Sequence, residues 1–273
     1  MVNLEFGILK DKFIFLFFIH NNNGDIMYII LTLISVVLIS ISQIISELCI
    51  KNTDVHTTTL LKSIFILLIS LLFIKNVRIN LYIILSSICL TLSWIFYFLS
   101  LKKNKLVDVA PIFLLSTSIT IILSNIIFKT NTKILFILLG NIIMIKKFSF
   151  IAFIEALFLS FQIIFLKLSK INPMNAILVN SIISIFILLP IKKSYKNIKI
   201  NYIFIISVLT FISWLLHYKA INIGNINIVV SLEKINIFLT LILSNLILKE
   251  KINKRVIFGF VFFLIGIYLQ IVK

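Results

Sequence analysis

The chain contains few of the residues that build catalytic, metal or cofactor sites. It has two cysteines, three histidines, three prolines and six glycines. Cys49 and Cys89 both lie in apolar sequence, which suits neither a disulfide framework nor a metal site. An H-E-x-x-H motif, a His/Asp cluster, a phosphate-cradling glycine-rich loop and a nucleotide-binding domain are all missing. The sequence therefore predicts no enzyme, no metal and no cofactor, and it excludes pumping by ATP hydrolysis within this chain.

Acidic residues are also scarce, with 9 Asp and Glu against 26 Lys and Arg. In a soluble chain this balance would indicate a nucleic-acid partner. Here the cations lie almost wholly in short tracts between apolar runs, where they anchor helix ends, signal topology and contact lipid phosphates. We therefore expect membrane lipids and no nucleic acid as partners.

What the chain has in excess is apolar sequence. It is 61% hydrophobic with a mean hydropathy of +1.18, and its apolar residues form runs of roughly 20, the length that crosses a bilayer as a helix. We predict an all-α integral membrane protein with ten transmembrane helices at residues 26–46, 57–74, 81–101, 107–128, 134–145, 148–168, 174–191, 200–221, 226–248 and 256–272. The run 134–145 gives only ~18 Å of helix, so flanking lysines and local thinning of the bilayer would have to compensate.

Residues 1–25 form an N-terminal extension before the first predicted span. Their one apolar run, residues 13–19, is too short to cross a bilayer, and no small-residue cleavage site follows it. The extension is either an interfacial arm or sequence upstream of a true start at Met27.

An internal duplication organises the rest of the chain. Residues 93–133 align without a gap on residues 213–253, and the only two tryptophans, Trp94 and Trp214, fall on the same register, 120 positions apart. A fainter match at a shift of 119 pairs Gln43 with Gln162. We therefore predict a first repeat over residues 26–145 and a second over residues 146–273.

Each repeat would hold five helices, an odd number, so the second would enter the membrane from the opposite side. This predicts two inverted five-helix repeats, the arrangement by which secondary transporters build two conformations around a central site.

Charged and amide side chains at membrane depth are the first candidates for a solute-binding site, because hydrocarbon makes them costly. Glu233, Asn236, Thr240 and Ser244 follow a helical stripe within residues 226–248. Lys234 lies about 100° around the helix from Glu233 and would either edge a cavity or neutralise Glu233 through a neighbour. The alternative is that Glu233 and Lys234 tie helices together without a substrate role.

Aromatic side chains occupy matched positions in the two repeats. Trp94 with Tyr97, and Trp214 with His217, are i, i+3 pairs that could stack an apolar or cationic solute. Tryptophan also anchors helices at the membrane interface. His217 could carry a coupling proton or simply hydrogen-bond a neighbour.

Two further spans carry polar residues on one face. Glu155 and Gln162 share a face of residues 148–168, and Ser40, Gln43 and Glu47 share a face of residues 26–46. Turned inward, these faces would complete a cavity walled by the first, third, fourth, sixth, eighth and ninth spans. The alternative is again hydrogen bonding between helices. In the last span, Gly259 and Gly266 would permit close helix packing.

The second repeat carries sequence patterns that resemble a known family. YKAI from Tyr218, IVVSLEK from Ile228, LILKEKI from Leu246 and the glycines of the last span are similar to the Y-x-A-L, V-A-S-L-L-x-x-L-E-P and L-x-x-x-E-x-L patterns of the EamA-type branch of the drug/metabolite transporter superfamily. Lys234 stands where the family pattern has proline, and Thr130 replaces an acidic residue. The resemblance covers Met27 to the C-terminus and implies a bacterial inner (plasma) membrane protein with both termini in the cytoplasm. The Lys and Arg count of the loops leans slightly the other way.

These patterns together predict a secondary transporter, acting as an exporter of small metabolites, amino acids or drug-like solutes by alternating access. The predicted substrate-binding residues are Gln43, Trp94, Tyr97, Glu155, Gln162, Trp214, His217, Glu233, Lys234 and Asn236. The chain would act as a monomer or a homodimer. The alternative function is a membrane enzyme or accessory protein that acts on lipid-linked substrates.

Overall fold

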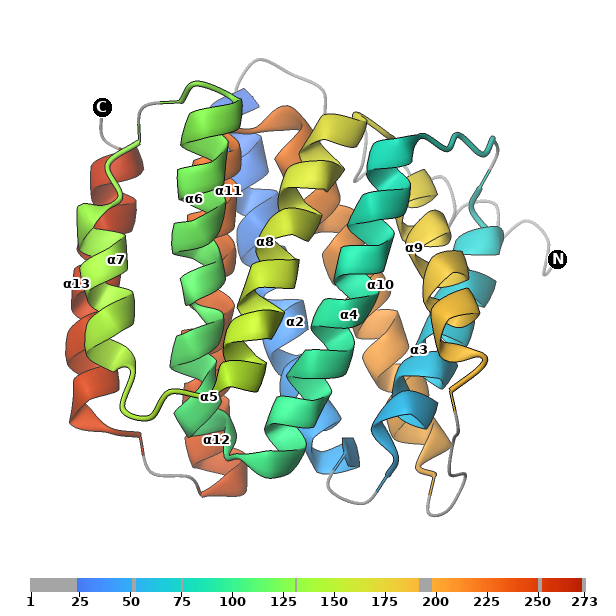
Figure 1. The fold of residues 1–273 in the computed structure, drawn as a ribbon, viewed down its shortest axis with the longest axis horizontal. Helices are drawn as coiled ribbons and strands as arrows, with labels where there is room; N and C mark the ends of the chain where they lie inside the picture. The colour runs from blue at the N-terminus through green and yellow to red at the C-terminus, as the bar shows by residue number, and fades with distance from the viewer. Residues whose placement is uncertain are drawn as a thin grey trace, which may run out of the picture.

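The structure is a computed structural model that describes residues 24–50, 53–74, 76–130, 132–191, 198–249 and 252–271 (Figure 1). All regular elements in this part of the chain are α-helices. Their bounds are α2 Gly24–Ile50, α3 Val55–Leu71, α4 Leu81–Lys103, α5 Leu106–Phe113, α6 Leu115–Ile127, α7 Leu135–Met144, α8 Phe150–Ser169, α9 Pro173–Leu188, α10 Ile200–Ile223, α11 Ile226–Glu233, α12 Ile235–Leu248 and α13 Lys254–Ile271. The predicted extension, residues 1–25, lies outside the described residues except for Gly24 and Asp25, which begin α2.

The distribution of polar and apolar residues is that of a membrane protein. In the described part of the chain, seven helical spans are long and apolar enough to cross a membrane, and the apolar helices α3, α7 and α9 are shorter. Large apolar side chains such as Leu72 and Phe186 face outward, each 73% exposed, while Ser86, Thr120 and Asn227 are fully buried. Hydrocarbon imposes this distribution, because polar groups must find their partners inside the protein. The chain is an all-α, multi-pass membrane protein, as predicted.

Two predicted spans are not the continuous helices that the sequence suggested. The span 107–128 divides into α5 and α6 at Leu114, and the span 226–248 divides into α11 and α12 at Lys234. In the first span Pro111 lacks the backbone N–H that a helix interior needs. The second break has no proline, and there the predicted polar stripe is interrupted, since Glu233 ends α11 while Asn236 lies in α12.

The two breaks are alike in position and in hydrogen bonding. Leu114 and Lys234 are 120 positions apart, the spacing of the duplicated sequence. Ser160 Oγ donates to the carbonyl of Ser116, and Ser40 Oγ donates to the carbonyl of Asn236, both at 3.0 Å. Each acceptor lies two residues beyond a break, so a hydroxyl from a neighbouring helix bonds the irregular backbone there.

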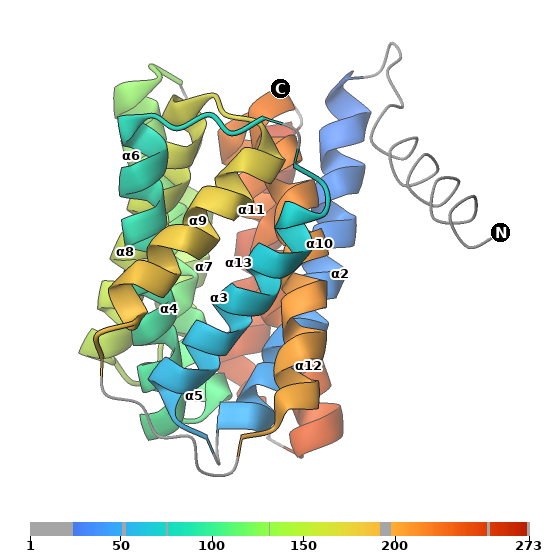
Figure 2. The same cartoon turned by 90° about the vertical axis from the view of Figure 1, so that its right-hand side faces the viewer.

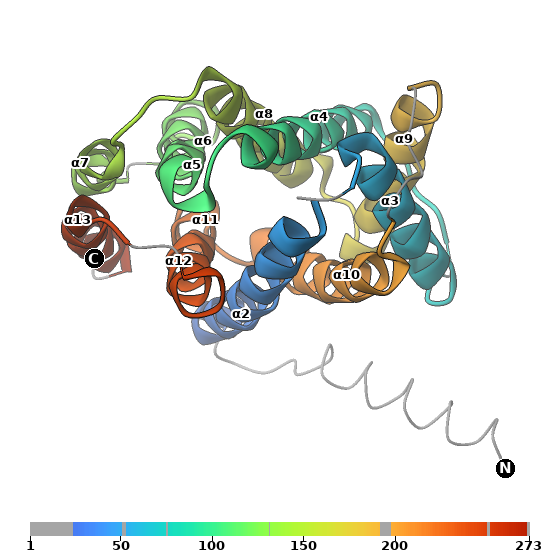
Figure 3. The ribbon, with the colours of Figure 1, turned by 90° about the horizontal axis from the view of Figure 1, so that it is seen from below.

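The helices form two layers that are closed at both ends by helix pairs. Seen from below, α4, α5, α6 and α8 form one layer and α2, α10, α11 and α12 the other (Figure 3). Within the layers α4 packs mainly on α8, and α10 mainly on α2. The pair α7 and α13 closes one end, and the pair α3 and α9, seen from the side in Figure 2, closes the other. Because α11 packs on α6 and α12 packs on α5, the two broken spans run antiparallel.

Hydrogen bonds between the main helix pairs give a closer measure of the repeat spacing. Ser86 Oγ donates to the carbonyl of Gln162, at 3.0 Å, and Ser42 Oγ donates to the carbonyl of Ile206, at 3.5 Å. Adding 120 to 42 gives 162, and adding 120 to 86 gives 206. At this spacing, each of the two bonded pairs is therefore the equivalent of the other. Gln162 is thus equivalent to Ser42, one residue from the Gln43 that the fainter sequence match proposed.

Glycines bring α7 and α13 into close contact, as predicted for Gly259 and Gly266. A Cβ on Gly259 would lie 2.6 Å from the carbonyl oxygen of Gly140, and a Cβ on Gly266 would lie 2.8 Å from the backbone nitrogen of Ile137. Both distances are too short for a carbon atom, so only glycine allows this helix separation.

We expect Gly259→Val to lower the thermal unfolding temperature of the purified protein by several degrees, because its side chain would force α7 and α13 apart. Val261→Leu, which enlarges a half-exposed side chain on the same helix, is the matched control. Equal unfolding temperatures for the two variants would contradict the proposed role of Gly259 in helix packing.

Candidate functional site

A cavity lined by both polar and apolar side chains lies between the two layers, beside the breaks in the membrane helices. Its volume is about 100 Å³, enough for several water molecules or a small solute group. Side chains from α2, α4, α5, α8, α10, α11 and α12 line it, so all six spans predicted to wall a cavity contribute. All ten predicted substrate-binding residues face this one cavity: Gln43, Trp94, Tyr97, Glu155, Gln162, Trp214, His217, Glu233, Lys234 and Asn236.

Three ionisable side chains form a buried cluster at the second break. Lys234 Nζ lies 3.4 Å from Glu233 Oε2, and His217 Nε2 lies 4.0 Å from the same oxygen. The sequence left two roles open for Lys234, at the edge of a cavity or as the counter-ion of Glu233. In the structure Lys234 lines the cavity and also pairs directly with Glu233. Glu233 sits at the boundary between α11 and α12, where the start of α12 presents a partial positive charge.

Glu155 of α8 brings a second carboxylate to the cavity from the opposite layer. Its Oε1 accepts a hydrogen bond of 3.2 Å from Ser93 Oγ. The equivalent contact in the other layer, 120 positions away in both partners, joins Ser213 and Ser35 hydroxyls at 2.9 Å. The same helix contact therefore occurs in both layers. Its partner for serine is a carboxylate in one layer and a hydroxyl in the other.

The two glutamines line the cavity but already have partners in the protein. Gln43 Oε1 accepts a hydrogen bond of 2.7 Å from Thr240, and Gln162 Nε2 donates one of 3.4 Å to the Tyr218 hydroxyl. These bonds link helices, which is the alternative that the sequence left open for such residues.

The tryptophans meet at the centre of the bundle. Their ring centroids lie 5.6 Å apart at an interplanar angle of 80°. Trp94 also contacts Tyr97, as predicted, but Trp214 stacks on Tyr218, one residue beyond the predicted partner His217, which faces Glu233 instead. Both indoles face the cavity, a position that does not fit anchoring at the membrane interface.

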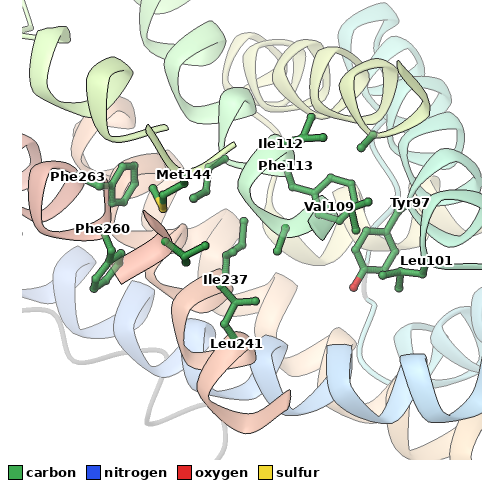
Figure 4. Close-up of a cluster of buried hydrophobic side chains, with 14 of the residues drawn as sticks. Tyr97, Leu101, Val109, Ile112, Phe113, Met144, Ile237, Leu241, Phe260 and Phe263 are labelled. Atoms are coloured by element: carbon green, nitrogen blue, oxygen red, sulfur yellow. The ribbon is translucent and has the colours of Figure 1, made fainter. Parts of the chain in front are cut away.

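An apolar cluster forms the adjoining wall of the cavity (Figure 4). Tyr97, Phe113 and Ile237 belong both to this cluster and to the cavity lining. The cluster continues to Phe260 and Phe263 of α13, so apolar packing joins the site to the α7–α13 pair. The polar groups of the cavity thus lie against packed apolar side chains.

Polar atoms without hydrogen-bond partners converge on the cavity. In the described part of the chain these buried atoms include Tyr97 Oη, Glu155 Oε2, His217 Nδ1 and Asn236 Oδ1, and all four residues line the cavity. A buried polar atom left unbonded costs roughly 1–3 kcal/mol, so native proteins rarely keep several together. Their arrangement suits water or a polar solute that completes the missing bonds.

The sequence did not identify one charged residue beside this site. Lys62 of α3 is 2% exposed, and its Nζ lies over the ring of Trp94. The signal was present, because this lysine interrupts the apolar run 60–74, as Glu233 interrupts another. Tyr218 was noted in the sequence only as part of a family motif. It lines the cavity, and the prediction omitted it.

The fold and the site define a polytopic membrane protein with a polar cavity at the centre of its helices. A model of the EamA-like transporter family matches residues 146–272. The chain is also 38% identical, over 104 residues, to the uncharacterized protein MJ1333.1 of Methanocaldococcus jannaschii, in an alignment that covers 36% of this chain and 76% of that protein. The chain belongs to the EamA-like transporter family.

A solved crystal structure, described only as that of a protein, has a TM-score of 0.68 to this chain at 12% sequence identity. The match covers 90% of this chain and 98% of the other. At this identity the likeness concerns the fold alone.

The Glu233–Lys234 contact can be tested by a double-mutant cycle. We expect Glu233→Gln and Lys234→Met each to reduce the free energy of unfolding by about 3 kcal/mol, because each leaves a buried charge without its counter-ion. The double variant should lose much less than the sum. Denaturant unfolding in detergent micelles measures all four proteins, with Lys254→Met, at an exposed position, as control. Additive losses would show that the two side chains do not interact.

Proposed function

We propose that this protein is a secondary transporter that exports small metabolites, amino acids or drug-like solutes by alternating access around the central cavity. The observation that carries the proposal is the group of four unbonded polar atoms on residues that line one cavity between the two helix layers. A solute or water can complete these bonds, whereas hydrocarbon cannot. Family membership supports a transporter and leaves the solute open.

We further propose that the two halves, residues 26–145 and 146–273, are inverted repeats. Support comes from the antiparallel course of the broken spans and from the exchange of partners between halves, in which α4 packs on α8 and α10 on α2. Lys129 and Lys249, which are 120 positions apart, both have left-handed backbone, with φ of 53° and 56°. The family model begins its match at residue 146. Two related units of opposite orientation provide two conformations of similar energy.

Polar contacts at one end of the bundle support the alternating-access part of the proposal. Asn227 at the start of α11 donates from Nδ2 to Asn125 Oδ1 at 3.2 Å and to Thr130 Oγ1 at 3.1 Å, and it also bonds Thr132. Nearby, Asn80 Nδ2 donates to the carbonyl of Ser169 at 2.9 Å. These bonds join the two proposed repeats on one side of the cavity. We infer that they close this side and break when the cavity opens toward it.

The orientation and the partners rest on the same proposal. The family resemblance favours both termini in the cytoplasm, with a small-molecule substrate and surrounding lipid as partners. The chain surrounds its cavity with its own helices, so a monomer suffices for this function.

Metabolite profiling tests the transport function. We compare the medium of cells that produce the wild-type chain, the Glu233→Gln variant or the Lys254→Met control. We expect at least one solute to be enriched in the medium by the wild type and the control, and its enrichment to fall about tenfold or more with Glu233→Gln. Uptake of that same solute, isotopically labelled, into proteoliposomes then gives the direct measurement. Equal enrichment by wild type and Glu233→Gln would remove this carboxylate from the mechanism.

A second test concerns the closed end of the cavity. Asn227→Val removes at least three hydrogen bonds and installs the residue found 120 positions earlier, Val107. In a chain with Cys49→Ala, Cys89→Ala and Ser46→Cys, which places a thiol on the cavity wall, we measure labelling by a membrane-impermeant thiol reagent from each side. We expect Asn227→Val to raise labelling about tenfold from the side on which α11 begins, since each 1.4 kcal/mol shifts a population tenfold. Unchanged labelling from that side would refute the closure.

A further inference from the structure

The side-chain nitrogen of Lys62 lies over the ring of Trp94, with the ring of Trp214 to one side. Lys62 lies on α3, and its Nζ is 2.7 Å from the ring centroid of Trp94 and 5.4 Å from that of Trp214. Its backbone carbonyl accepts a hydrogen bond of 3.4 Å from Ser207. The lysine is thus directed inward from the α3–α9 end of the bundle toward both indoles.

The ammonium lies behind the indoles as seen from the main cavity. Lys62 does not line that cavity but lines a second one of about 10 Å³, roughly the space for one water molecule. Leu90, Trp94 and Trp214 line both cavities and therefore form the wall between them. The other residues around the smaller cavity are Thr59, Ser63, Ile66, Asn180, Ser181 and Ser184. A solute in the main cavity would meet the indoles before it met the lysine.

The contact with the indoles is the main interaction of this charge. Lys62 Nζ has no hydrogen-bond partner among the described residues. A buried ammonium without a counter-ion destabilises a membrane protein, so apolar packing does not account for a lysine here. The face of an indole attracts cations within about 6 Å, most strongly where water is excluded, and both rings meet that condition.

Pairs of aromatic rings are also the sites at which proteins bind organic cations such as quaternary ammonium groups. In this chain the protein supplies the cation itself. A second cation on the cavity side of the same rings would be repelled by a like charge at close range. The Glu233 carboxylate does not offset this effect, because it is paired with Lys234.

We propose that Lys62 is a specificity-determining residue, a built-in cation that lies behind Trp94 and Trp214 and repels organic cations from the cavity. The proposal deepens the transporter function and rests on it for the claim that solutes enter this cavity. It assigns neutral or anionic solutes to the wild-type chain. Removal of the charge should open the site to cations.

The sequence provides a direct probe, because Trp94 and Trp214 are its only tryptophans. Intrinsic tryptophan fluorescence of the purified full chain in detergent micelles therefore reports on this site alone. We titrate the protein with N-methylpyridinium, a small organic cation that quenches indole fluorescence on contact, and separately with acrylamide, a neutral quencher. The variants are Lys62→Met, Lys62→Gln and Lys62→Arg, with Lys254→Met as the control for loss of a lysine elsewhere.

We expect saturable quenching by N-methylpyridinium in Lys62→Met and Lys62→Gln, with an apparent affinity at least tenfold above that of the wild type, Lys62→Arg and Lys254→Met. Acrylamide quenching should remain alike in all five proteins. Size-exclusion profiles identify a variant that fails to fold, and the second neutral variant then decides the result.

Three results would overturn the proposal. The wild type could bind N-methylpyridinium as tightly as the neutral variants, the neutral variants could gain no affinity, or acrylamide quenching could rise in parallel, which would mean that the substitution merely loosened the helices. The measurement is one of binding and not of transport. A chain that gains cation binding on loss of Lys62 but exports nothing would leave this inference intact and refute the transporter proposal.

Discussion

Hydrocarbon offers no hydrogen bonds, and this constraint explains most features of the molecule. Hydroxyl and amide side chains are gathered inside the bundle, where Ser86, Ser42 and Ser160 bond backbone carbonyls of neighbouring helices. Where the constraint is not met, around the central cavity, several buried polar atoms are left unbonded. Several of these atoms face one cavity, and this shared direction locates the candidate site.

The broken helices give that centre its geometry. A continuous helix would satisfy its own backbone and present only side chains to the cavity. The breaks at Leu114 and Lys234 instead bring helix ends into the middle of the bundle, and one of them places Glu233 and Lys234 side by side on the cavity wall. Because the breaks lie at equivalent positions of the duplicated sequence, the surroundings are related on the two sides. The charged side chains differ between the two sides, since Ser35 occupies the position equivalent to Glu155.

Much of this arrangement could be predicted from the sequence. Apolar length predicts the helices, seven of which in the described part of the chain are long enough to cross a membrane. The ten predicted substrate-binding residues line one cavity, because charged and aromatic side chains are costly at membrane depth unless they face a shared interior. The helix breaks could not be predicted, since Lys234 follows no proline and the local pattern reads as one helix. Lys62 was missed because its partner is a ring face supplied by α4, and contacts between distant helices leave no local pattern.

The exchange of partners between the two halves has a consequence for biosynthesis. The main partner of α2 is α10, and that of α4 is α8, so neither helix finds its main partner within the first five spans. While the ribosome is still producing the second half, hydroxyls such as those of Ser42 and Ser86 must remain in the bilayer without the carbonyls that they finally bond. Assembly is therefore dominated by contacts between residues far apart in sequence, which is the pattern of slow folding. The nascent chain is most vulnerable to degradation just before α8 and α10 have inserted.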